Sequence, residues 1–130
     1  MSKTILIVDD NELHLRLGQE LLQAHGYQVD VANNGVEALT KIRERQPDLV
    51  LLDIKMPGIS GLDLAQEMRR DPSLAALPVV AVTALARQSD KEACVDAGCN
   101  GYMAKPYTMR ELLDLVARYL SPQSVEAGVP

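Results

Sequence analysis

This 130-residue sequence contains no Phe and no Trp, so its hydrophobic core must be built from Leu, Val, Ile, Ala and Met. The formal net charge is −5, and no run of Lys or Arg occurs. That charge argues against DNA and against an anionic membrane surface as partners, because both require a basic face. No apolar run approaches the roughly 20 residues of a membrane span, and no signal peptide precedes the first strand-like run. We therefore expect a cytoplasmic protein with an aliphatic core.

Cysteine and histidine are also scarce, with two of each. Cys94 and Cys99 lack metal-ligand spacing, and no His follows them closely, so we interpret them as reduced, partly buried thiols. His14 and His25 are isolated, on or near the first predicted helix, and we assign them surface or helix-end roles. Neither residue type therefore indicates a soft-metal site or a histidine-based catalytic centre.

Short apolar runs alternate with amphipathic stretches along the chain. The runs are too short for helices and rich in β-branched or large aliphatic residues; they cover residues 5–8, 29–31, 49–52, 79–82 and 102–104. Three are uninterrupted, which is typical of central parallel strands covered on both faces. The second and the last run are typical of edge strands.

Helix-length segments separate these runs, at about 12–25, 35–45 and 61–70, with two more that begin near 89 and 108. Leu recurs at four-residue spacing in the first. Signals for helix starts and stops are found at the expected places, namely Asn34 with Glu37, Ser60, Ser89 with Glu92, Thr108 with Glu111, and the terminating Gly26 and Gly98.

Five successive β–α units predict an α/β fold, with a doubly wound, five-stranded parallel sheet and five helices. We expect one domain over residues 1–120. Residues 121–130 lack a helical pattern and are expected to form a disordered tail.

Polar residues stand at the ends of the predicted strands. Asp9 and Asp10 follow the first strand, Asp53 ends the third, Thr83 ends the fourth and Lys105 follows the fifth. Each alone is commonly structural, since an Asp pair after a strand is often a helix cap and a Lys before Pro is often a solvated charge. Ligand sites of open parallel sheets lie at the carboxyl ends of the strands, so all five residues should converge.

Three neighbouring carboxylates repel one another, and a hard divalent cation such as Mg²⁺ removes that repulsion while keeping positions open for a phosphorylated partner. Lys105 and Thr83 add a cation and a hydroxyl donor. These groups are the ones needed for phosphoryl transfer to a carboxylate.

The stretches that carry these residues resemble the receiver domains of response regulators, the CheY-like family. They are ILIVDD at 5–10, LLDIKMPG at 51–58 with Gly61, residues 78–84, and GYMAKP at 101–106, within a resemblance that covers about 4–120. It implies a flavodoxin-like sheet with strand order 2-1-3-4-5.

The resemblance assigns the acidic residues to phosphoryl and metal chemistry. Asp53 would accept the phosphoryl group and contribute to the Mg²⁺ site. Asp10 would bind Mg²⁺ directly, Asp9 would help through water, and the backbone carbonyl of Lys55 would be a further ligand. No organic cofactor is implied.

The resemblance also assigns the conformational switch. Lys105 would pair with Asp53 and then with the phosphoryl group, and Thr83 would close on a phosphoryl oxygen. Tyr102 would follow Thr83 as the switch aromatic. The Lys105–Pro106 peptide bond would be cis.

The function implied is that of a stand-alone response regulator in a two-component or phosphorelay system. A histidine kinase or phosphotransfer protein would donate the phosphoryl group, and the chain would catalyse its own phosphorylation and dephosphorylation without being an enzyme in the usual sense. The surface of the fourth helix, fifth strand and fifth helix would then change its affinity for a downstream protein, with the chain a monomer or a weak phosphorylation-dependent dimer. Within the family, residues 77–108 resemble stand-alone regulators of the DivK type and the receivers of hybrid kinases.

Three alternatives fit less well. An Asp-nucleophile phosphatase or mutase commonly has a second Asp two residues after the first, where this chain has Lys55. An FMN carrier would need a phosphate-binding loop after the first strand, where Asp9 and Asp10 would repel phosphate. A degenerate receiver that only binds partners would not need the complete set of site residues.

Two positions lead to a kinetic prediction. Lys55 and Leu85 stand two residues after Asp53 and Thr83, where family members have side chains that border the path of the hydrolytic water. A long cation and an apolar group orient water poorly, so we expect slow to moderate loss of the phosphoryl group. Phosphoryl decay after loading with a small phosphodonor measures this, and a half-life of only seconds would contradict it.

Overall fold

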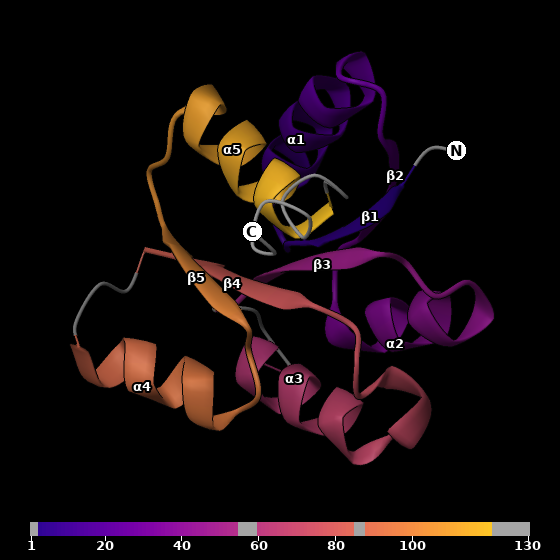
Figure 1. The fold of residues 1–130 in the computed structure, drawn as a ribbon, viewed down its shortest axis with the longest axis vertical. Coiled ribbons are helices and arrows are strands. Elements are labelled where there is room, and N and C mark those ends of the chain that lie inside the picture. Colours follow the sequence, from indigo (N-terminus) through magenta and orange to yellow (C-terminus); the bar gives the residue numbers. More distant parts are fainter. Residues whose placement is uncertain (1–2, 55–59, 85–87, 121–130) are drawn as a thin grey trace, which may run out of the picture.

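The computed structural model describes residues 3–54, 60–84 and 88–120. Its strands form one parallel sheet in the order β2-β1-β3-β4-β5, as the sequence predicts (Figure 1). The strands are β1 (Thr4–Val8), β2 (Gln28–Ala32), β3 (Leu49–Asp53), β4 (Val79–Thr83) and β5 (Gly101–Ala104). The helices are α1 (Glu12–Ala24), α2 (Gly35–Glu44), α3 (Gly61–Arg70), α4 (Gln88–Asp96) and α5 (Met109–Leu120), with a 3₁₀ turn η1 (Pro72–Leu74) after α3.

Helices cover both faces of the sheet. Figure 1 shows α1 and α5 on one side and α2, α3 and α4 on the other. Alternate residues of each central strand therefore enter different cores: Ile5 and Ile7 pack with α1 and α5, whereas Leu6 and Val8 pack with α2 and α3. Both cores are built almost entirely of aliphatic side chains, as the absence of Phe and Trp requires. Among the described helices, none has the length and apolarity to cross a membrane.

Most of the local start signals are confirmed. Thr108 and Glu111 form a reciprocal capping box, in which each side chain accepts a hydrogen bond from the other residue's backbone N–H at 2.9 and 3.0 Å. Asn34 caps α2, and Ser60 caps α3. The box predicted at Ser89 is wrong, because α4 already includes Gln88 and Ser89 is therefore inside the helix. A cap contributes only about 1 kcal/mol, so packing of the helix against the core can override it.

The leucine spacing correctly indicates α1, but the stripe it marks is not the buried one. Leu13 and Leu17 are 59% and 55% exposed. The face that packs on the sheet carries Leu15, Gly18 and Leu22 instead. The four-residue spacing therefore identifies the helix without identifying its core side.

The end of α4 brings the two cysteines together. Gly98 has a φ of +102°, and the N–H of Cys99 donates to the carbonyl of Cys94 at 3.0 Å. This is the Schellman pattern, whose outer positions commonly share an apolar contact. Both thiols are free and buried, more deeply than predicted, and burial raises the pKa of Cys99 to about 12. Cys94 and Cys99 form no disulfide in this structure.

Arg69 of α3 joins three segments at the amino ends of β4 and β5. Its guanidinium donates to the carbonyls of Gly98 (2.9 Å), Leu74 (3.0 Å), Ala75 (3.2 Å) and Leu77 (2.9 Å), and to Oδ1 of Asn100 (2.8 Å). The Asn100 oxygen also accepts the backbone N–H of Val79 at 2.9 Å. One side chain therefore holds α3, the η1 segment and the α4–β5 turn in register.

We predict that Arg69→Ala lowers the free energy of unfolding by about 3 kcal/mol, because several partly buried carbonyls lose a charged donor together. Arg70→Ala is the matched control. Arg70 is 73% exposed, and among the described residues its one ion pair is with Glu67, at 3.6 Å, so its loss should cost about 0.5 kcal/mol or less. Urea unfolding measures both values, and equal effects of the two substitutions would contradict this role of Arg69.

Candidate active site

The end of β3 fixes Asp53 at the carboxyl edge of the sheet. Asp53 is the last residue of the strand, 7% exposed, and lies opposite Val82 of β4. Gly61 begins α3 directly against it: a Cβ at this position would lie 2.4 Å from the carbonyl oxygen of Asp53. The N–H of Gly61 also donates to the backbone carbonyl of Ile54 at 3.1 Å. Only glycine allows this close approach, which explains why Gly61 belongs to the motif around Asp53.

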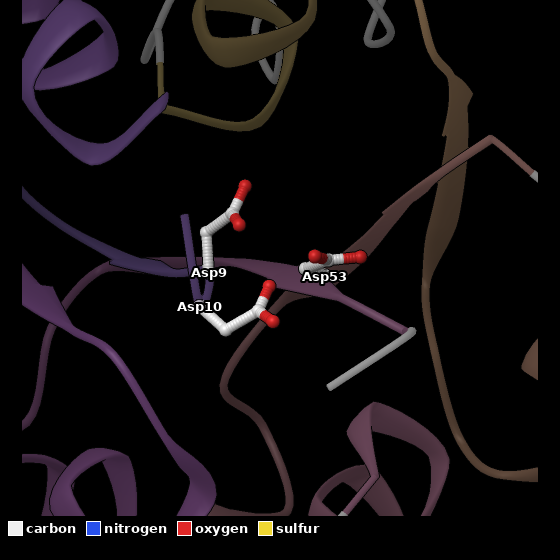
Figure 2. Close-up of side chains that lie close together, drawn as sticks. All are labelled: Asp9, Asp10 and Asp53. Atoms are coloured by element: carbon white, nitrogen blue, oxygen red, sulfur yellow. The ribbon is translucent and has the colours of Figure 1, made fainter. Parts of the chain in front are cut away.

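Asp9, Asp10 and Asp53 form one acidic cluster, as predicted. Each can place a carboxylate oxygen within 4.8 Å of the others. Figure 2 shows Asp9 and Asp10 leaving the chain on different sides after β1, beside Asp53 at the end of β3. Asp9 is buried and Asp10 is exposed. Oxygen ligands at this spacing fit a hard divalent cation.

Lys105 supplies the positive charge of the cluster, but it contacts two carboxylates and not one. Its Nζ donates to Oδ2 of Asp9 at 3.1 Å and lies 3.7 Å from Oδ2 of Asp53. Burial alone would raise the pKa of Asp9, yet the N–H of Asn11 and the Lys105 ammonium outweigh burial and lower it. Burial would likewise lower the pKa of Lys105, but Asp9 and Asp53 together raise it. Both groups are thus held in their charged forms.

Thr83 and Tyr102 lie on β4 and β5, as the sequence predicts. Thr83 ends β4 and is 1% exposed, and its carbonyl accepts the N–H of Lys105 at 2.8 Å. The hydroxyl of Tyr102 on β5 is buried, and among the described residues it has no hydrogen-bond partner. The Lys105–Pro106 peptide bond is cis, as predicted. Lys55 and Leu85 lie outside the described residues, as do residues 121–130.

Two neighbours of the site were not identified from the sequence. His14 is exposed, as expected for a surface residue, but its Nδ1 lies 3.3 Å from Oδ2 of Asp9. Tyr107 lines the same small cavity as Asp9 and Asp53, and burial raises its pKa. Their positions in the sequence could have indicated them. His14 stands one helical turn after Asp10, and Tyr107 stands two residues after Lys105.

The arrangement combines a carboxylate, which is chemically able to act as a nucleophile, with positive charge and hydrogen-bond donors. Asp53 is at a strand end, an ammonium is 3.7 Å away, and two further carboxylates could share a cation with it. A group that arrives with negatively charged oxygens would meet Lys105 and a bound cation there. Such a site can stabilise the equatorial oxygens of a phosphoryl group during transfer.

Comparison with known proteins gives the same family as the sequence motifs. The family model of the response regulator receiver domain matches residues 5–117. The polar-differentiation response regulator DivK of Brucella anthropi is 40% identical over 120 residues, which are 92% of this chain and 98% of that protein. DivK of Brucella ovis is 39% identical over the same lengths.

Solved structures agree in fold. The chemotaxis protein CheY4 of Vibrio cholerae superposes with a TM-score of 0.88 at 27% identity, covering 92% of this chain and 100% of that one. The receiver domain of a sensor histidine kinase from Pseudomonas aeruginosa, which has a magnesium ion coordinated in its active site cleft, gives 0.84 at 31% identity over 92% and 98% of the two chains. This chain therefore belongs to the response regulator receiver domain family and is a response regulator of two-component signalling.

Proposed function

We propose that Asp53 accepts a phosphoryl group from a histidine kinase or a phosphotransfer protein, and that the chain's own residues promote the transfer. The bond from phosphorus to the donor histidine nitrogen breaks, and a bond from phosphorus to an Asp53 carboxylate oxygen forms. The observation that carries this proposal is the position of Asp53 within 4.8 Å of two other carboxylates and 3.7 Å from the Lys105 ammonium. The family supports histidine kinases or phosphotransfer proteins as the class of donor.

Lys105 is suited to neutralise charge before and after transfer. Its ammonium already lies between Asp9 and Asp53, so a small movement brings it to an oxygen of a phosphoryl group on Asp53. Thr83, at the end of the neighbouring strand, has a hydroxyl that can donate to a second oxygen.

The acidic cluster fits Mg²⁺. Asp10 and Asp53 would bind it, Asp9 would support it through water, and the carbonyl of Lys55 is proposed as a further ligand. When bound, the ion would neutralise carboxylate charge and draw in phosphoryl oxygens. The magnesium ion in the related Pseudomonas aeruginosa receiver supports this assignment.

Thr83 and Tyr102 are proposed to convert phosphorylation into a change of surface. The Tyr102 ring packs against the core beneath α4. The Nζ of Lys91, on α4, lies 5.6 Å from the centroid of that ring. Within the described residues, no hydrogen bond holds the Tyr102 hydroxyl in one orientation, and a buried hydroxyl left unpaired costs about 1–3 kcal/mol. Movement of Thr83 toward a phosphoryl group would bias Tyr102 and hence the α4-β5-α5 face, through contacts that differ between the two states.

The output is proposed to be binding of a downstream protein by that face, in the cytoplasm, with the chain acting as a monomer or a weak phosphorylation-dependent dimer. The similarity to DivK over 98% of that protein's length supports a single-domain regulator. Spontaneous loss of the phosphoryl group from Asp53 would return the surface to its resting form.

Asp53→Asn should abolish phosphorylation by a small acyl phosphate, because the carboxamide is not a nucleophile. Asp114→Asn is the control: Asp114 is an exposed carboxylate on α5, away from the cluster. Intact mass after incubation with donor and Mg²⁺, followed by peptide mapping, measures the label. A modified Asp53→Asn protein, or a label on another residue of the wild type, would contradict the assignment.

Asp10→Asn should stabilise the metal-free protein, because one of three mutually repelling carboxylates is removed. The same change should remove the stabilisation by Mg²⁺, which for the wild type is about 1.4 kcal/mol at ten times the dissociation constant. Urea unfolding with and without Mg²⁺ measures both effects. Asp63→Asn, on an exposed carboxylate in the first turn of α3, should behave like the wild type. Unchanged Mg²⁺ stabilisation in Asp10→Asn would sink the proposed ligand set.

A further inference from the structure

His14 touches the acidic site from α1. Its Nδ1 lies 3.3 Å from Oδ2 of Asp9 and 3.5 Å from Nζ of Lys105. The Asp9 side chain is only 8% exposed, whereas that of His14 is 45% exposed. The half-exposed side chain of His14 therefore connects α1 to a buried carboxylate of the cluster.

The start of α1 places His14 accurately. The backbone N–H of Asn11 donates to Oδ1 of Asp9 at 2.9 Å. The side chain of Asn11 in turn caps α1 and accepts the backbone N–H of His14 at 3.1 Å. Asp9, Asn11 and His14 thus form a closed loop of hydrogen bonds, in which both oxygens of Asp9 contact the first turn of α1.

We propose that His14 is a positioning residue of the acidic site, which orients the Asp9 carboxylate and so raises the affinity of the cluster for a divalent cation. This inference rests on the proposed function, because it assumes that the cluster binds Mg²⁺. A carboxylate accepts hydrogen bonds only, so His14 acts through an Nδ1–H donor.

The expected sign follows from how Oδ2 of Asp9 is shared. This oxygen receives the Lys105 ammonium at 3.1 Å and the His14 ring at 3.3 Å. Without His14, Lys105 would be the one side-chain donor that the described residues offer to Oδ2, and the carboxylate would be free to turn toward it and away from Asp10. Hydrogen bonds to side chains that bind a metal directly typically affect metal affinity by about 10- to 100-fold, and Asp9 acts one step further from the ion, through water. Because His14 is also half exposed and its contact is long, we expect an effect no larger than the lower limit of that range.

The experiment compares His14→Leu, which removes the donor, with His14→Asn, which retains an N–H near the position of Nδ1. Titration of the metal-free full chain with Mg²⁺, followed by NMR or calorimetry, gives the dissociation constant. We expect His14→Leu to weaken Mg²⁺ binding about 5- to 10-fold. His14→Asn should restore it to within about twofold of the wild type, as expected if the donor alone is required.

His25→Leu is the matched control, because His25 is the other histidine of the α1 region and its Nδ1 lies 3.0 Å from the carbonyl of Leu21, away from the cluster. It should bind Mg²⁺ like the wild type. Urea midpoints of the metal-free proteins establish that all three variants fold. Wild-type affinity in His14→Leu, tighter binding in it, or failure of His14→Asn to recover would each overturn the inference.

The two proposals fail in different ways. A chain that binds Mg²⁺ in a His14-dependent manner but takes no phosphoryl group on Asp53 would contradict the proposed function and leave the positioning role intact. A chain that is phosphorylated on Asp53 with an affinity for Mg²⁺ that ignores His14 would contradict only the positioning role.

Discussion

Repulsion among Asp9, Asp10 and Asp53 is the constraint around which the site is arranged. Carboxylates that can approach within 4.8 Å, two of them buried, favour protonation unless positive charge or hydrogen-bond donors surround them. Lys105 and the backbone N–H of Asn11 meet that need for Asp9, whose pKa lies below its usual value despite burial. Asp9 is therefore held in its charged form beside the other two carboxylates.

The parallel sheet is what brings these charges together. Residues 9, 53, 83 and 105 belong to four strand ends, and the strands between them are held by two aliphatic cores on opposite faces. Gly61 completes the arrangement, because α3 can begin against the carbonyl of Asp53 only without a side chain at that position. The electrostatic repulsion within the cluster is thus offset by the stability of the sheet and its two cores.

Arg69 fixes the amino end of the sheet, opposite the acidic site. At the amino ends of β4 and β5, Arg69 makes five hydrogen bonds that hold α3, the segment after it and the end of α4. Tyr102, the second residue of β5, has a buried hydroxyl that bonds no described residue. The proposed switch therefore uses a side chain that no hydrogen bond to the described residues holds in place, on a strand whose amino end Arg69 fixes.

The sequence by itself determined the order of elements, the strand ends, the caps at Asn34, Ser60 and Thr108, and the residues of the acidic cluster. These features follow from local periodicity and from the rule that parallel strands share a carboxyl edge, so no distant contact was needed to predict them. Only the tertiary structure decided that Leu13 and Leu17 face outward, that α4 includes Ser89, that Lys105 bonds Asp9 more closely than Asp53, and that His14 reaches Asp9. Each of these depends on how a helix is rotated or placed against the sheet, and that is fixed by packing between residues far apart in the chain.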